Sequence, residues 1–164
     1  MSDSRPPLPQ KRPNAIPLIL RIGLIAGTLD ITDNLIFNYF RGITPKMVFQ
    51  YIASGLIGMK AFDAGSASVA LGVALHYAIA LTWTAVFYAA SRKLTILHRR
   101  PVISGLLYGA AVYLFMNFAV VPLSRVPHVH NLITLANRIN GILALLLCIG
   151  LTISLLVRHS APPA

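Results

Sequence analysis

Four long runs of apolar residues dominate the chain, and each is long enough to cross a membrane. A membrane-spanning helix needs about 20 mostly apolar residues, because a helix rises about 1.5 Å per residue through a hydrocarbon core about 30 Å thick. The runs cover residues 17–40, 69–91, 102–121 and 132–157. The pattern predicts four transmembrane helices packed as a four-helix bundle. Pro122 is expected to end the third helix, because proline cannot continue a helix.

Residues 46–62 form a fifth apolar stretch that is too short for a span and is interrupted by Gln50. A stretch of this length is typical of a short interfacial or re-entrant helix. The fold class predicted is therefore an all-α integral membrane protein with four spans and one such helix.

The basic residues favour one orientation of the four spans. Cytoplasmic segments of membrane proteins carry an excess of Lys and Arg. With the N-terminus inside, the cytoplasmic side holds Arg5, Lys11, Arg12, Arg92, Lys93, Arg99, Arg100 and Arg158, and the outer side holds Arg41, Lys46, Lys60 and Arg125. A fifth span at 46–62 would move the Arg92–Arg100 group outside. We therefore predict four spans with both termini cytoplasmic.

The same pattern divides the chain into three parts. Residues 1–16 are rich in proline and basic residues, and we expect a disordered basic cytoplasmic tail. Residues 17–158 form a single membrane domain, and residues 159–164 form a short tail.

Composition agrees with this class. Of the 164 residues, 56% are hydrophobic and 11% are charged, whereas soluble domains carry about 25% charged residues. The formal net charge of +10 could indicate nucleic acid, but the basic residues flank the apolar runs. We therefore expect anionic lipid headgroups at the cytoplasmic face, and no nucleic acid, as the partner of these residues.

No metal or cofactor is predicted. A single cysteine, Cys148, cannot form an intramolecular disulfide or a cysteine-based metal site within one chain. His128 and His130 alternate in the loop after Pro122, but a third ligand for copper or zinc is not identified.

Small residues recur at helical spacing within the spans. Because lipid tails are as apolar as leucine, small residues, which let backbones approach, are what draw transmembrane helices together. Six glycines are predicted to pack helix against helix: Gly23, Gly27, Gly72, Gly105, Gly109 and Gly141.

Five polar residues fall at similar depths in the outer half of the predicted bundle. They are Asp30, Asp33, His76, Asn117 and Arg138. Ionisable groups in a membrane span are costly and mark either function or a paired structural site. The cluster could bind a proton, an ion or a ligand; alternatively, the acids pair with Arg138 or with amide side chains and hold the bundle together.

Several segments of the sequence resemble a group of small uncharacterised multi-span bacterial inner-membrane proteins. The resemblance rests on Gly27-x-x-Asp30, Ser54-Gly55, His76 and the segment from Asn117 to Ser124, and it covers residues 22–125. It implies a multi-pass protein of the bacterial inner membrane and supplies no activity or site residues.

Three functions remain open at this point. The chain carries no phosphate-binding loop, dinucleotide fingerprint, HExxH zinc motif or Glu-x-x-His di-iron pattern, so no catalytic residue is assigned. The first hypothesis is a non-enzymatic accessory, assembly or lipid-contacting protein, alone or within a homo-oligomer or larger complex. The second is an oligomeric proton- or cation-coupled small-molecule transporter or channel subunit that uses Asp30, Asp33 and His76. The third is a lipid-modifying enzyme at the outer leaflet, with Asp30 or His76 as general base.

Overall fold

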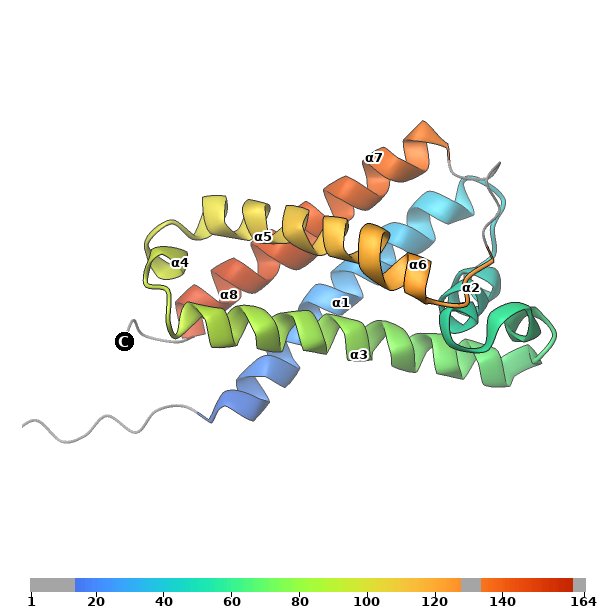
Figure 1. Ribbon diagram of the computed structural model, residues 1–164, viewed down its shortest axis with the longest axis horizontal. Helices are drawn as coiled ribbons and strands as arrows, with labels where there is room; N and C mark the ends of the chain where they lie inside the picture. The colour runs from blue at the N-terminus through green and yellow to red at the C-terminus, as the bar shows by residue number, and fades with distance from the viewer. Residues whose placement is uncertain (1–13, 128–133, 161–164) are drawn as a thin grey trace, which may run out of the picture.

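The computed structural model describes residues 14–127 and 134–160, and every regular element in these ranges is a helix (Figure 1). Four continuous helices in it are long and apolar enough to cross a membrane. The predicted all-α fold with four membrane-spanning helices is confirmed. The expected tails fall mainly on residues 1–13 and 161–164, which lie outside the described residues, as do His128 and His130.

Two of the four helices are regular and two contain wider turns. The regular ones are α1 (Ala15–Tyr39) and α3 (Gly65–Ser91). The third consists of α5 (Pro101–Phe115), the π-helical η2 (Met116–Val120) and α6 (Val121–Leu123); the fourth consists of α7 (Leu135–Ala144), the π-helical η3 (Leu145–Leu151) and α8 (Thr152–Ser160). These bounds differ from the predicted spans by only a few residues.

The expected short helix is α2 (Pro45–Ile57), which continues into the 3₁₀ turn η1 (Gly58–Phe62). Thr44 caps its start, since the Thr44 hydroxyl accepts a hydrogen bond from the backbone N–H of Met47. Gln50 then fixes α2 to the start of α3, because its Nε2 donates to the hydroxyl oxygen of Ser68 and to the carbonyl oxygen of Phe62. Gln50, the residue that interrupts the apolar stretch, is thus the one that anchors it.

The bundle has two distinct ends (Figure 1). The start of α1, the short helix α4 (Ile96–Arg99) and the end of α8 lie at one of them, which we call the terminal end. Helix α2 lies at the other, which we call the α2 end. The charged residues in the described segments that join the long helices therefore lie at these two ends.

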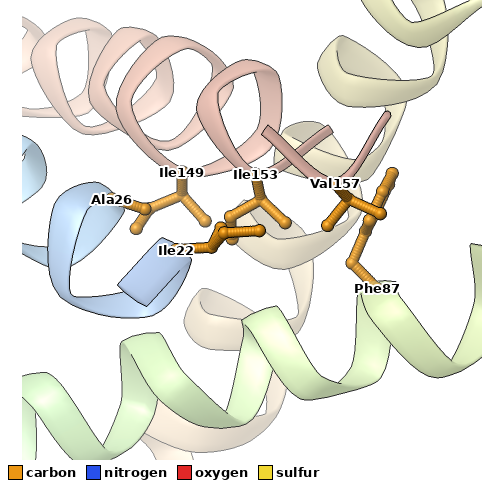
Figure 2. Close-up of a cluster of buried hydrophobic side chains, with 6 residues drawn as sticks. All are labelled: Ile22, Ala26, Phe87, Ile149, Ile153 and Val157. Atoms are coloured by element: carbon orange, nitrogen blue, oxygen red, sulfur yellow. The ribbon is translucent and has the colours of Figure 1, made fainter. Parts of the chain in front are cut away.

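A hydrophobic core fills the half of the bundle toward the terminal end (Figure 2). Ile22 and Ala26 of α1 meet Ile149, Ile153 and Val157 of the fourth helix, and Phe87 of α3 closes the cluster. Each of these side chains is at most 3% exposed. This half of the bundle is solidly packed.

The third and fourth helices approach backbone to backbone at glycines. A Cβ placed on Gly105 would lie 2.8 Å from the Cα of Leu151, and one on Gly109 would lie 2.6 Å from the Cα of Leu146. Gly150 faces both glycines from the fourth helix, and a Cβ there would meet the carbonyl oxygen of Gly105. Gly150 was not among the predicted packing residues.

The remaining predicted glycines differ in how closely a neighbouring helix approaches them. A Cβ on Gly23 would lie 2.7 Å from Leu81 Cδ2, and one on Gly27 would lie 3.0 Å from the Cβ of Ala80, so both glycines lie where α1 crosses α3. Gly72 of α3 lies against the backbone of Phe49 in α2. Gly141 has more space, because the nearest atom to a Cβ there is Tyr113 Cε2 at 3.8 Å.

We predict that Gly150→Ala destabilises the protein. The added methyl group would meet backbone atoms of Gly105 and Gly109, which cannot rotate away as a side chain would. Overpacking of this kind costs about 1–3 kcal/mol. Thermal unfolding of the detergent-solubilised protein, followed through the fluorescence of Trp83, would measure the loss. Gly141→Ala is the matched control on the same transmembrane helix and is expected to leave the midpoint unchanged; equal effects of the two variants would contradict the prediction.

Candidate ligand-binding cavity

A cavity of about 510 Å³ occupies the half of the bundle toward the α2 end. Its walls come from α1, α2, α3 and both irregular helices. Four of the five predicted polar residues line it: Asp30, His76, Asn117 and Arg138. The fold therefore brings together, around one space, residues that lie on four different spans.

His76 joins α3 to α1. Its ring is 9% exposed, and its Nε2–H donates to the carbonyl oxygen of Gly27 at 2.8 Å. This contact depends on the close approach of the two helices at Gly27. The tautomer that makes it leaves Nδ1 as the acceptor nitrogen of the ring. A second link is made one residue further along each helix, where the hydroxyls of Thr28 and Tyr77 lie 3.0 Å apart.

Asp33 does not line the cavity. Its Oδ2 accepts a hydrogen bond from Asn140 Nδ2 at 2.9 Å, which joins α1 to α7. Near the α2 end, Arg41 Nη1 donates to the Thr134 hydroxyl at 3.2 Å and joins the segments at the end of α1 and the start of α7. The expected pairing of an acid with an amide side chain is found here, and the amide is Asn140, which sequence analysis did not single out.

Asp30 lies one helical turn from Asp33, in the direction of the hydrophobic core. It is half-buried and is the only acidic residue among the described residues that line the cavity. No hydrogen bond to its carboxylate is found among residues 14–127 and 134–160. No buried side-chain oxygen in these ranges lacks a partner, so the carboxylate is open to the cavity, and the charged groups that act on it are His76 and Asp33. The nearby amide of Asn34 also lines the cavity, and its Oδ1 accepts from Asn38 Nδ2. Asp30 therefore presents a carboxylate that is open to the cavity and lies close to His76.

Arg138 lies on the first turn of α7, at the level of the cavity wall toward the α2 end, whereas Asp30 lies at the level toward the hydrophobic core. Its side chain is exposed, and it is the only Lys or Arg among the described residues that line the cavity. The hydrogen bond between Asp33 and Asn140 sets the level of α7 against α1. Asp30 lies three residues from Asp33 toward the terminal end. Arg138 lies two residues from Asn140 toward the α2 end. At 1.5 Å per residue, the two charged residues differ in depth by about 7.5 Å.

The π-helical segments contribute to the same walls. Wide turns of this type often occur at functional sites. Pro122 has no N–H, so it removes the helical donor for the carbonyl of Phe118, within η2. Asn117 lies in η2, where its Nδ2 donates to the carbonyl oxygen of Tyr113 at 2.9 Å. Asn117 thus stabilises the irregular helix as well as facing the cavity.

Helix α2 covers the cavity and supplies residues that sequence analysis missed. The backbone N–H of Arg125 donates to the carbonyl oxygen of Gly55 at 2.9 Å and holds α2 in place. Tyr51 of α2 lines the wall, and desolvation raises the pKa of its hydroxyl above the ordinary value. Trp83, Tyr113 and Asn137 also line the cavity. The approach of α2 could not be read from its sequence, because it depends on contacts distant in the chain.

A second, almost wholly apolar groove of about 410 Å³ adjoins the cavity. It lies between α3 and the third helix and shares four residues with the cavity wall: Ile79, Trp83, Met116 and Val120. Trp83 and Phe115 meet edge-on with ring centroids 5.3 Å apart. The groove extends along α3 to Val86, toward the terminal end. Cavity and groove therefore adjoin at a shared wall, and we refer to the two together as the concave surface; the cavity carries several polar side chains in a mainly apolar lining, and the groove is almost wholly apolar.

We predict that Asp33 and Asn140 are energetically coupled. Asp33→Ala and Asn140→Ala should each destabilise the protein, and the double variant should lose less than the sum. Hydrogen bonds between transmembrane helices contribute about 0.6 kcal/mol on average and up to about 1.7 kcal/mol. A double-mutant cycle on the unfolding free energy measures this term. The pair Asp33 and Asn117, between which no hydrogen bond forms, is the control; additivity at Asp33 and Asn140 would contradict the assignment.

In the part of the chain that the structure describes, no group of three or more histidine, cysteine or acidic residues could hold a metal ion. No protein-family model, curated protein or solved structure matches the chain.

Proposed function

We propose that the protein is a non-enzymatic, multi-pass membrane protein that binds one amphipathic lipid molecule within its bundle. The observation that carries the proposal is that a cavity with several polar side chains shares a wall with an almost wholly apolar groove. An amphipathic molecule has a polar head and a hydrocarbon chain, and the concave surface offers a matching place for each.

The polar wall supports a bound head group. The Asp30 carboxylate is open to the cavity and makes no hydrogen bond with the described residues, and a carboxylate within a span is costly unless a donor reaches it. A ligand head group that donates hydrogen bonds would remove that cost. The carboxylate thus favours an occupant with polar donors over an acyl chain alone.

The solid half of the bundle favours binding over passage. Ile22, Phe87 and Ile153, each at most 2% exposed, fill the space between the helices below the cavity (Figure 2). A transport path through one copy of the chain would have to open this core. A proton- or cation-coupled transporter is the second candidate, because Asp30 and His76 are both titratable and both line the cavity.

We also propose a bacterial inner-membrane location with cytoplasmic termini. Basic side chains gather at the terminal end of the described structure, on the segment 92–100 and at Arg158. Anionic headgroups of the cytoplasmic leaflet would attract them by about 1 kcal/mol per residue. The cavity would then open within the outer leaflet.

Cysteine labelling tests this orientation. In a Cys148→Ala background, we expect Lys60→Cys at the α2 end to react with a membrane-impermeant maleimide on intact spheroplasts. Arg99→Cys at the terminal end should react only after the membrane is opened. Lys60 and Arg99 are both exposed, so access to reagent depends on the side of the membrane. The reverse labelling pattern would overturn the orientation.

Filling the cavity tests lipid binding. Gly141 lines the cavity and has space for a side chain, so Gly141→Leu should occupy the cavity without disturbing the backbone. We expect the wild-type protein, extracted in a mild detergent, to retain one lipid in native mass spectrometry. Gly141→Leu should reduce the retained fraction about tenfold, which corresponds to about 1.4 kcal/mol of binding free energy.

The matched control is Leu143→Phe, an enlargement at a half-exposed position on the same helix that does not line the cavity. Leu143→Phe should retain lipid as the wild type does, and both variants should unfold at the wild-type temperature. Equal retention by the wild type and Gly141→Leu would refute lipid binding in this cavity.

A further inference from the structure

We propose that the bound lipid is a phospholipid whose head group carries both a primary amine and a phosphate, of the phosphatidylethanolamine class. This inference rests on the proposed function and names its ligand. It follows from three features of the concave surface: an acid at its deep polar end, an arginine at its outer rim, and an apolar groove beside it.

Asp30 selects the amine. It is the only acidic residue of the described wall, and its carboxylate is open to the cavity with no hydrogen bond to the described residues. A primary ammonium group carries three N–H donors and a positive charge, so it satisfies the carboxylate by charge and by hydrogen bonding together. The Oδ1 of Asn34 and the Nδ1 of His76, both on the same wall, are acceptors for the remaining N–H groups.

Arg138 selects the phosphate. Its guanidinium is a planar set of five donors that matches the oxygens of a phosphate. The side chain is exposed at the outer level of the cavity wall, and among the described residues no acidic side chain other than Asp30 lines that wall. The difference in depth of about 7.5 Å between Asp30 and Arg138 leaves room for a head group whose amine and phosphate are joined by two carbons.

The groove receives a hydrocarbon chain. It begins at Ile79 and Trp83, which it shares with the cavity, and it runs along α3 to Val86 and across to Phe115. Each residue further along α3 lies about 1.5 Å closer to the terminal end. The glycerol and its chains follow the phosphate, so with the amine at Asp30 the head group folds inward beside the glycerol. The hydrocarbon chain then passes the amine and runs along the groove toward the membrane midplane.

The wall discriminates among common head groups. Phosphatidylglycerol carries the phosphate without an amine, so its head group brings no positive charge to the Asp30 carboxylate. Phosphatidylcholine carries a positive charge but no N–H donor, so its head group donates no hydrogen bond to the Asp30 carboxylate. Buried polar groups left without partners cost about 1–3 kcal/mol, which is sufficient for a preference of about tenfold.

A competition experiment on the full chain tests the inference. The purified protein is equilibrated with an equimolar mixture of phosphatidylethanolamine, phosphatidylglycerol and phosphatidylcholine of identical acyl chains, and the retained lipid is identified by native mass spectrometry. We expect the wild type to retain phosphatidylethanolamine about tenfold over each of the others. Equal retention of the three lipids would overturn the head-group assignment.

Two head-group variants separate the roles of the charged residues. Asp30→Asn is nearly isosteric and should abolish the preference among the three lipids while some lipid is still retained. Arg138→Gln changes an exposed side chain and should lower the retention of all three lipids by similar factors, because all three carry the phosphate. An unchanged preference in Asp30→Asn would overturn the assignment of the amine to Asp30.

A pair of bulky variants tests the groove. Val86→Trp places a large side chain in the groove without touching the cavity wall and should lower retention of all three lipids. Leu114→Trp, at a position of similar exposure outside both the groove and the cavity, should not. Equal effects of these two variants would remove the groove from the proposal.

The outcomes distinguish this inference from the proposed function. Retention of lipid by the wild type without preference, together with its loss in Gly141→Leu, would overturn the head-group assignment and leave lipid binding in place. No retention of any of the three lipids above the level of Gly141→Leu would overturn both. Should Asp30→Asn fail to fold, the wild-type preference and the response of Arg138→Gln still decide the assignment.

Discussion

The backbone contact of Gly105 and Gly109 with Gly150 is the constraint on which the rest of the structure depends. In lipid the hydrophobic effect does little to bring apolar helices together. A transmembrane bundle is therefore held most tightly where backbones approach closely. The third and fourth helices meet at these glycines, in the half of the bundle that contains the hydrophobic core. From there α6 and α7 diverge toward the α2 end (Figure 1). The cavity is the space that this divergence leaves.

Polar contacts then replace small-residue packing where the helices separate. Toward the core, α1 and α3 touch through Gly23 and Leu81. Further along, they are joined by His76 and the carbonyl of Gly27, and α1 is joined to α7 by Asp33 and Asn140. Each of these polar pairs satisfies a group that would be costly in hydrocarbon. The polar residues in the spans are thus divided between those that hold the open half together and those, such as Asp30, that face its interior.

Sequence pattern predicted the spans well because uninterrupted apolar runs of about 20 residues are rare outside membrane-spanning helices. From helical rise it also predicted similar depths for five polar residues. Four of them line the cavity, where Asp30 and Arg138 lie at different levels of the wall. It did not predict Gly150, which has no glycine partner at helical spacing on its own helix and is identified only by Gly105 and Gly109 across the interface. Asn140 was not predicted for a similar reason, because its partner Asp33 is 107 residues away in the chain. Pairing between helices is a property of the assembled bundle, so a single sequence read along its length does not contain it.

The contrast between the solid and the hollow half also accounts for Asp30, a carboxylate that a chain with so few charged residues keeps within a span. A carboxylate in a packed core would need a partner from the protein, and Asp33 already uses the nearby amide of Asn140. Asp30 lies between these two environments, one turn from Asp33 and facing the cavity. A carboxylate in that position costs free energy until something in the cavity donates to it. If this residue served only the bundle, asparagine would pack as well, so the acid itself is the feature on which the proposed occupant rests.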